Sequence, residues 1–429
     1  MGEDKDYIAG LNDKIREHRL KSLKKLKEGI EKGRVPRPED KGYVNNHIHT
    51  TYSFSPYSPS KALWMAYNSG LTTAGIMDHD SISGAEEFIE AGKIIGMATT
   101  IGLECRVDFS GTSLEGKRIN NPDQNTIAYM ALHGIPHTQI HKVKSFFAPY
   151  TLERNKRNRL MVGKINKIFK PFGIELDFNR DVIPLSQSHD GGSITERHLL
   201  FALSKKLVKS FGKTEKLLEF LMKDLGLHIN LKMIEYLLDF NNEFYEYDLL
   251  GLLKSDLVEK IYIDATLECP HVSEVLAFSK NIGAISAYAY LGDVGDSVTG
   301  DKKAQRFEDE YLDLLFRQIE ELGFNAVTYM PTRNTLDQLQ RIKNKCREYG
   351  LFEISGEDIN SPRQSFICEA LNKAEFKNLI ESTWALIGHE ISATQNIDQG
   401  IFSSQTMLKY PHLQDRIDIY SKIGIGNNK

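Results

Sequence analysis

The apolar residues of this chain change their spacing near residue 43. From there, short apolar runs alternate with longer segments in which apolar residues recur at helical spacing. The strand-like runs are YVNNHIHT (43–50), TTAGIMDHD (72–80) and MATTIGLECRVDF (97–109), and the helical segments are PSKALWMAYNSG (59–70) and SGAEEFIEAGKIIG (83–96). Strands that alternate with helices are typical of βα units, so the pattern predicts a parallel sheet or barrel.

The same alternation returns in the second half of the chain. It resumes at KIYIDAT (260–266) and continues to LFEISGED (351–358). The stretch between, 111–258, is mostly helical in pattern, although it contains the strand-like TIAYMALHGI (126–135). We therefore expect one barrel that is interrupted by a helical insertion.

The two ends of the chain differ from this middle part. Residues 7–34 place apolar residues at helical spacing among many lysines and arginines, and VPRPEDKG (35–42) then stops the helix. The C-terminal stretch predicts a closing helix and a loosely structured tail. The expected organisation is a basic N-terminal helix (1–42), a first barrel part (43–110), a helical insertion that contributes His133 and His198 (111–258), a second barrel part (259–390) and a tail (391–429).

Composition narrows the class of protein and the kind of metal site. The 429 residues carry 54 Lys and Arg against 58 Asp and Glu, a net charge of −4, with 41% hydrophobic residues, which excludes fibrous and wholly disordered chains. The four cysteines form no CxxC pair, so any metal must be held by histidines and carboxylates. The start, MGEDKDYIAG, lacks the order of a secretory signal and no long apolar run follows, so we expect a cytoplasmic protein without a membrane partner.

The placement of histidines and carboxylates indicates where the chemistry lies. His47 and His49 end a predicted strand, and because strand side chains alternate, both imidazoles lie on one face, as a single metal ion requires. Asp78 and His79 end the next strand, and Glu104 ends the one after it. Three consecutive strands thus deliver possible ligands to their C-terminal ends, where a βα barrel gathers its active site.

Three further residues are candidates for the same site. Asp358 follows the last predicted strand, shortly after Ser355 and Gly356, and suits a closing carboxylate ligand. His133 follows the strand-like run of the insertion. His198 lies in the first turn of a helix that Thr195 can cap.

These residues occur in motifs that resemble the PHP family, named for polymerase and histidinol phosphatase. The matching segments are NHIHTTYS (46–53), MDHD (77–80), GLE (102–104), SGEDIN (355–360) and, for a phosphatase branch, ITERHLLFAL (194–203). The resemblance covers about 43–108 and 260–370, with short pieces of the insertion. It implies an α/β fold, a distorted (β/α)7 TIM-like barrel, and the hydrolysis of a phosphate ester by metal-activated water.

The resemblance also implies roles for single residues. His47, His49, Glu104 and Asp358 would hold a first metal, and Glu104 would bridge to a second, helped by His133 or His198. His79 would belong to a third site. The catalytic roles are expected of Asp78, His79 and His198, and the cofactors would be two or three divalent ions of Mn, Fe or Zn, which this ligand set does not distinguish.

The chain departs from the family at three places. Phe54 stands where the family often has a ligating Asp or His, and Asn360 replaces the last histidine of the closing motif, which puts the third metal in doubt. Where the family has an Ala-His-Pro strand end, this chain has Tyr288 and Tyr290, which either ligate as phenolates or only pack.

Four basic residues are candidates for binding the substrate phosphate. Arg106 lies two residues after Glu104, on the same strand face. Lys302, Lys303 and Arg306 belong to a polar loop (290–311) that would lie over the barrel mouth. The basic stretches 7–34 and 142–170 are interpreted as solvated faces, because no aromatic-interleaved motif accompanies them.

Three functional hypotheses remain open at this point. The first is a metal-dependent phosphoesterase that acts on a small phosphorylated substrate. The second is a single-strand nuclease or phosphodiesterase that uses the same metals, with basic helices of the insertion guiding the nucleic acid. The third is a PHP-like scaffold or binding protein whose metal site has decayed. The sequence indicates neither the substrate nor the oligomeric state.

Overall fold

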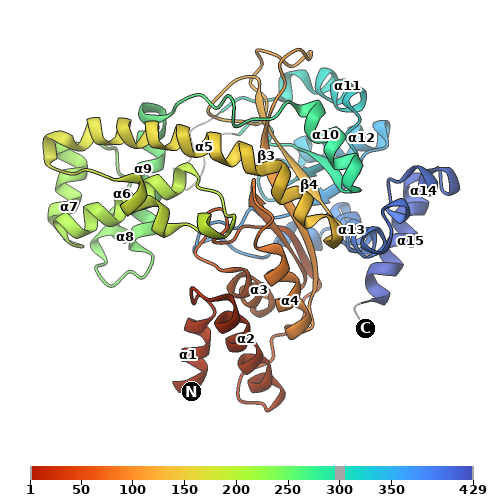
Figure 1. Cartoon of the computed structure of the whole chain (residues 1–429), viewed down its shortest axis with the longest axis horizontal. Coiled ribbons are helices and arrows are strands. Elements are labelled where there is room, and N and C mark those ends of the chain that lie inside the picture. Colours follow the sequence, from red (N-terminus) through yellow and green to blue (C-terminus); the bar gives the residue numbers. More distant parts are fainter. Residues whose placement is uncertain (1, 295–304, 428–429) are drawn as a thin grey trace.

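A curled sheet of seven strands forms the centre of the molecule, with the strands in the spatial order β1 to β7. The structure is a computed structural model that describes residues 2–294 and 305–427. The strands are β1 (Tyr43–Ile48), β2 (Leu71–His79), β3 (Ala98–Asp108), β4 (Ile127–His133), β5 (Ile285–Ala289), β6 (Ala326–Tyr329) and β7 (Phe352–Ser355). Figure 1 shows the sheet surrounded by helices, with the insertion on the left.

The two edges of the sheet meet just beyond β7. Ile359 forms a parallel bridge with Ile48 at the end of β1. The backbone N–H of His49 donates to the Ile359 carbonyl (2.9 Å), and the N–H of Ile359 donates to the His47 carbonyl (3.1 Å). The predicted barrel-like α/β architecture is therefore present, and its closure brings residues near 358 beside the end of β1.

The prediction of parallel strands throughout is wrong at β4. This strand runs antiparallel to both β3 and β5, whereas the other neighbours are parallel. The link from β3 to β4 contains no helix to carry the chain back along the sheet, and antiparallel strands need no such crossover. His133 is the last residue of β4, as predicted, but the C-terminal end of β4 consequently points toward the opposite end of the sheet from that of a parallel strand.

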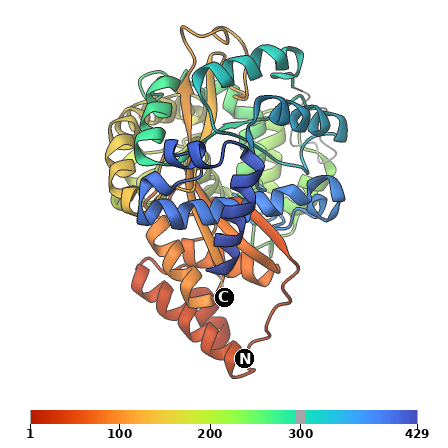
Figure 2. The same cartoon turned by 90° about the vertical axis from the view of Figure 1, so that its right-hand side faces the viewer.

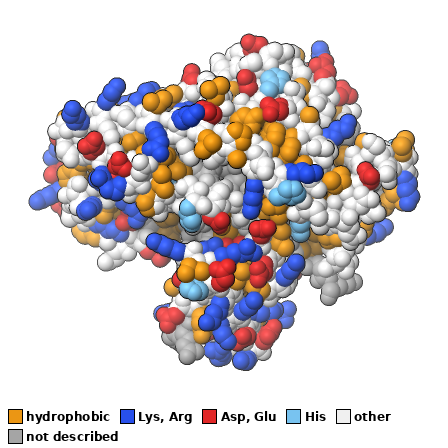
Figure 3. Space-filling view, in the orientation of Figure 1, with side chains coloured by type: hydrophobic (Ala, Val, Ile, Leu, Met, Phe, Trp, Pro, Cys, Tyr) orange, Lys and Arg blue, Asp and Glu red, His pale blue; other side chains and the backbone are white. Residues whose placement is uncertain are grey.

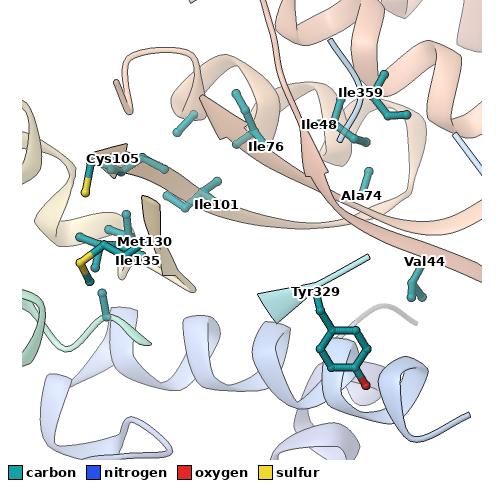
Figure 4. Close-up of a cluster of buried hydrophobic side chains, with 14 of the residues drawn as sticks. Val44, Ile48, Ala74, Ile76, Ile101, Cys105, Met130, Ile135, Tyr329 and Ile359 are labelled. Carbon is teal, nitrogen blue, oxygen red and sulfur yellow. The ribbon is translucent and has the colours of Figure 1, made fainter. Parts of the chain in front are cut away.

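The outer face of the sheet is covered by helices that start and stop at ordinary sequence signals. These helices are α3 (Pro59–Asn68), α4 (Ala85–Ile95), α10 (Val272–Ile282), α11 (Leu312–Leu322) and α12 (Leu336–Tyr349). Ser58 caps α3, Thr335 and Gln338 form a capping box on α12, and Gly96 ends α4 in the left-handed region. Figure 4 shows part of the resulting core, in which side chains of β1 to β4 and β6 lie together. Among the described residues, no helix has the length and apolar character needed to cross a membrane.

The insertion forms a second hydrophobic cluster beside the sheet. Its helices are α5 (Ile140–Phe169), α6 (Glu196–Phe211), α7 (Glu215–Glu219), α8 (Leu231–Leu238) and α9 (Tyr245–Ile261). Their apolar faces pack on one another, and Phe54, from the loop after β1, joins the same cluster. The insertion is therefore packed directly against the end of the sheet that carries the predicted ligands. Within 111–258, β4 belongs to the sheet and the helical part follows it.

The N-terminal region is two helices rather than the single helix that the sequence predicts. These are α1 (Gly2–Gly10) and α2 (Arg16–Glu31). Arg19 of α2 is buried and forms an ion pair with the buried Glu87 of α4, which also accepts hydrogen bonds from Ser60 (2.6 Å from its hydroxyl). A fixed ion pair therefore holds this region against the barrel.

The expected loose tail is helical and ordered. After α13 (Lys377–Gln395) come α14 (Ser404–Lys409) and α15 (Leu413–Gly426), which Figure 2 shows facing the viewer. Gly388 of α13 and Gly424 of α15 let the two helices touch backbone to backbone, since a Cβ on Gly388 would lie 1.9 Å from the Tyr420 carbonyl oxygen. Such close packing is not visible as hydrophobic periodicity, which explains the wrong prediction.

Candidate metal centre

Five side chains meet where β1 and β2 end: His47, His49, His79, Glu104 and Asp358. His47 and His49 flank Ile48, which packs in the core, so both imidazoles lie on the other side of the strand. His79 pairs directly with Glu104 across β2 and β3. The sequence predicts all five as metal ligands, and the structure brings them together.

Asp358 reaches this cluster because the chain after β7 runs alongside β1. Gly356 makes the close approach possible, since a Cβ there would lie 2.6 Å from the Cβ of His47. Asp358 then contributes its side chain to the site, whereas the next residue, Ile359, is buried in the hydrophobic core.

Glu104 is at the centre of the cluster. Its Oε1 lies 3.0 Å from Nδ1 of His79, 3.2 Å from Nε2 of His49 and 3.5 Å from Nε2 of His47. Nε2 of His49 also lies 3.2 Å from Oδ1 of Asp358. Nitrogens of His47 and His49 and an oxygen of Glu104 are close enough to share one metal ion.

The hydrogen bonds of His49 show which of its nitrogens is available. The Ser53 hydroxyl donates to Oδ1 of Asp78 (2.6 Å), so its oxygen accepts from Nδ1 of His49 at 3.1 Å. In a neutral imidazole this leaves the lone pair on Nε2, directed at two carboxylates. Nε2 of His47 and of His49 are both buried without a hydrogen-bond partner among the described residues. Lone pairs that face carboxylate oxygens need a cation between them, so this donor set fits a divalent metal.

The electrostatics of these side chains agree with this interpretation. Burial lowers the pKa of His49, but the carboxylates of Asp358 and Glu104 outweigh it and raise that pKa to about 10. Burial raises the pKa of Glu104, yet the adjacent histidines, His79 first, hold it well below its usual value. The carboxylates are therefore ionised, and a metal ion would compete with a proton for His49.

His133 lies close beneath this cluster. Ala131 of β4 is directly opposite Glu104, and His133 follows two residues later on the same face. Burial lowers the pKa of His133 to about 3, so the ring is neutral, and its Nε2 has no hydrogen-bond partner in the described part of the chain. A neutral nitrogen near Glu104 is suited to a second metal.

Asp78 lies behind the ligands rather than among them. Its carboxylate accepts hydrogen bonds from the backbone N–H of Thr50 (2.7 Å), the Thr50 hydroxyl (2.6 Å) and the Ser53 hydroxyl. Its contact with the cluster runs through Ser53 to His49. The structure therefore places Asp78 where it supports His49 through Ser53, and its catalytic role stays a prediction.

His198 is not brought into the cluster. Its Nδ1 accepts from the backbone N–H of Thr195 (3.0 Å) in the capping box of α6. Its ring meets Phe54 edge to face, with centroids 5.0 Å apart. Phe54 thus packs against His198 at the position where the family often has a metal ligand.

The structure also shows where Tyr288 and Tyr290 lie, the two residues found in place of the PHP family's Ala-His-Pro strand end. The hydroxyl of Tyr288 donates to Glu308 (3.2 Å) and that of Tyr290 to Asp309 (2.6 Å), and both rings belong to the core outside the cluster. Of the two possibilities left open by the sequence, the structure shows packing.

Of the predicted phosphate-binding residues, the two that the structure describes, Arg106 and Arg306, pair with carboxylates outside the cluster. Arg106 is buried and its charge is matched by Glu196 (3.0 Å) and Glu268 (3.1 Å), in a network that joins the barrel to the insertion. Arg306 is exposed and pairs with Glu310 (2.6 Å). Lys302 and Lys303 lie outside the described residues.

Three other cations near Asp358 were missed by the sequence reasoning: Arg197, Lys254 and Arg333. The Asp358 carboxylate raises the pKa of each, so all three lie within its electrostatic reach. The positive charge of Arg197 lowers the pKa of Lys254, whose side chain is exposed, to about 8. None of the three forms an ion pair with another described residue, and Nε of Arg333 is buried without a partner. Unpaired cations that lie this close together are typical of an anion site.

The mixed charges on the surface do not favour a nucleic-acid-binding face. Figure 3 shows Lys and Arg side chains over the insertion and the N-terminal helices, interspersed with acidic and uncharged ones. The exposed Lys156, for example, pairs with Glu153 on α5 (2.6 Å). This mixture is typical of a solvated face.

Sequence comparison with known proteins matches only a short part of the chain. No known protein-family profile matches the chain. A 5'-3' exoribonuclease from Haemophilus influenzae is 31% identical over 68 residues, 16% of this chain, so the chain spans only 25% of that curated relative's length.

Two solved structures resemble the chain. A candidate metal-dependent phosphoesterase from Bifidobacterium adolescentis has 18% identity and a TM-score of 0.51, over 79% of this chain and 96% of that one. An amidohydrolase from Chromobacterium violaceum, solved with bound sulfate and no metal, has 14% identity and a TM-score of 0.48, over 76% and 90%. The first likeness shows that the chain shares the fold of the Bifidobacterium protein.

Proposed function

We propose that this chain is a PHP-type metal-dependent phosphoesterase that acts on a small phosphorylated substrate. The observation that carries the proposal is the cluster of His47, His49, His79, Glu104 and Asp358, whose unpartnered nitrogens face carboxylate oxygens. A divalent ion between these nitrogens and carboxylate oxygens would satisfy both in a buried site.

One ion fits between His47, His49 and Glu104, whose ligand atoms lie close together. We propose that Asp358 completes this first site, and that Glu104 with His79 and His133 would hold a second ion. When bound, such ions supply Lewis acidity and a water of lowered pKa. A third ion has less support, because Phe54 cannot ligate and packs on His198.

The unpaired cations favour a phosphate ester over a neutral substrate such as an amide. The charge of Arg197 lowers the pKa of Lys254 despite nearby carboxylates, so a further anion would stabilise the two cations, and Arg333 has a buried Nε that needs an acceptor. The role of these residues would be to bind and orient the phosphate next to Asp358. Arginine suits this task because its guanidinium binds phosphate oxygens in pairs.

The test is the release of phosphate by the purified, metal-replete chain from a panel of phosphate monoesters. We expect metal-dependent turnover that His49→Ala abolishes. Lys156→Ala, on the exposed face of α5, is the matched control and should turn over at the wild-type rate. Equal turnover in wild type and His49→Ala would contradict the proposal.

A nuclease is the second candidate, since a curated protein that resembles a short part of the chain is an exoribonuclease. A 5'-phosphorylated single-stranded oligonucleotide in the same assay separates the two. Shortening of the oligonucleotide, dependent on His49, would assign the activity to the nuclease, whereas release of phosphate from small monoesters alone would assign it to the phosphatase.

A further inference from the structure

An ion-pair network lies where the insertion meets the barrel, and it joins residues of both. Three arginines face three carboxylates in it: Arg106, Arg154 and Arg157 against Asp80, Glu196 and Glu268. All of these residues except Glu196 are buried. The formal charges cancel, so the network as a whole is neutral.

Glu196 receives both of its ion pairs from this network. Nη2 of Arg106 donates to its Oε1 (3.0 Å), and Nη2 of Arg157 donates to the same oxygen. Arg106 comes from β3, two residues after Glu104, and its second pair, with Oε1 of Glu268 (3.1 Å), fixes the guanidinium. The strand that carries Glu104 therefore also determines where the Glu196 carboxylate lies.

Glu196 is also a carboxylate beside the unpaired cations. Arg197 is the next residue in the chain, and the negative charge of Glu196 raises the pKa of both Arg197 and Lys254. In the described part of the chain no ion pair joins Glu196 to either cation, and its Oε1 is bound by the two arginines of the network. Both cations are therefore left for another anion.

We propose that Arg106 is a positioning residue of the anion site: it holds Glu196 away from Arg197 and Lys254, so that both cations are free to bind the substrate phosphate. The inference rests on the proposed function, since it takes the anion to be a phosphate group, but it concerns a residue that does not touch the substrate. The sequence predicts Arg106 as a direct phosphate ligand, whereas its pairing with Glu196 and Glu268 makes its effect on phosphate indirect.

A role that only joins the insertion to the barrel would use the same contacts, but the two roles predict different effects of substitution. If Arg106 only holds the insertion, removing either partner of its pair with Glu196 weakens phosphate binding. If Arg106 offsets the charge of Glu196, removing the arginine weakens phosphate binding, whereas removing the charge of the carboxylate does not, because a charge near a binding site acts by its sign. The effect of Glu196→Gln therefore separates the two roles.

The experiment measures the affinity of the metal-replete, full-length chain for inorganic phosphate by isothermal titration calorimetry. We expect Arg106→Met to weaken phosphate binding about tenfold, because one carboxylate of the network is left unmatched. Glu196→Gln should bind phosphate as tightly as wild type or more tightly. The double variant Arg106→Met/Glu196→Gln should recover most of the lost affinity, since it removes both charges of the pair.

Arg19→Met is the matched control, because it also removes a buried arginine from an ion pair, here with Glu87 between α2 and α4. It should bind phosphate like wild type. Circular dichroism and metal content check that each variant is folded and loaded. If Arg106→Met does not fold, Glu196→Gln decides.

Weaker phosphate binding in Glu196→Gln would overturn the proposal. So would an unchanged affinity in folded Arg106→Met, an equal loss in Arg19→Met, or a wild-type chain that binds no phosphate. Because binding is measured without turnover, a chain that shows the expected affinities but hydrolyses no phosphate ester would overturn the proposed function and leave this inference standing. Turnover in wild type together with unchanged phosphate affinity in Arg106→Met would do the reverse.

Discussion

At the scale of single residues, His49 carries the most specific chemistry. Nδ1 is fixed by Ser53, and Ser53 in turn is fixed by Asp78, so Nε2 is directed at Glu104 and Asp358. Such outer contacts set the tautomer and the basicity of a ligand. The HxH pattern predicts the two histidines, but only the structure shows the hydroxyl that orients one of them.

The Ser53 hydroxyl is therefore expected to matter for metal binding. Ser53→Ala removes the acceptor of Nδ1, so the imidazole is free to place its proton on Nε2, and metal affinity should fall about tenfold. The measurement is Mn²⁺ titration of the stripped protein. Ser55→Ala, two residues away and also buried, is the control; equal affinities in the two variants would show that Ser53 does not orient His49.

At the scale of elements, the sequence predicts the strands and most helices but not their directions or their docking. Spacing alone defines a strand such as TIAYMALHGI, whereas its antiparallel direction depends on the connections around it. The prediction of a loose tail is wrong for a similar reason. α15 is held by a backbone contact of two glycines, and glycine contributes no apolar side chain to a pattern.

This glycine contact gives a prediction about stability. A Cβ on Gly388 would lie 1.9 Å from the Tyr420 carbonyl oxygen, so Gly388→Ala must push α15 away from α13. We expect the free energy of unfolding to fall by about 1–3 kcal/mol, measured by urea denaturation. Gly163→Ala, in α5, meets nothing within 4 Å and should be neutral or raise that free energy by roughly 0.5–1 kcal/mol. A Gly388→Ala protein as stable as Gly163→Ala would refute the backbone contact.

At the scale of the whole molecule, the insertion and the barrel together build the site. The barrel supplies the predicted ligands, and α6 and α9 of the insertion supply Arg197 and Lys254. No local pattern marks these cations, because their convergence depends on how the insertion docks. The buried contacts of Arg106 with Glu196 and Glu268 lie at that junction. The candidate ligands could thus be predicted from strand ends, whereas the residues proposed to bind an anion could not.

The metal centre is the central claim, and its most direct test is the number of divalent ions bound per chain. The chain should be purified in metal-replete buffer, freed of loose ions and measured by elemental analysis, alongside Glu104→Gln. We expect at least about one ion per wild-type chain, and a clear loss in Glu104→Gln, because Glu104 lies at the centre of the ligand set. A folded wild-type chain that retains no divalent ion, or a Glu104→Gln chain that retains as many as wild type, would contradict the account.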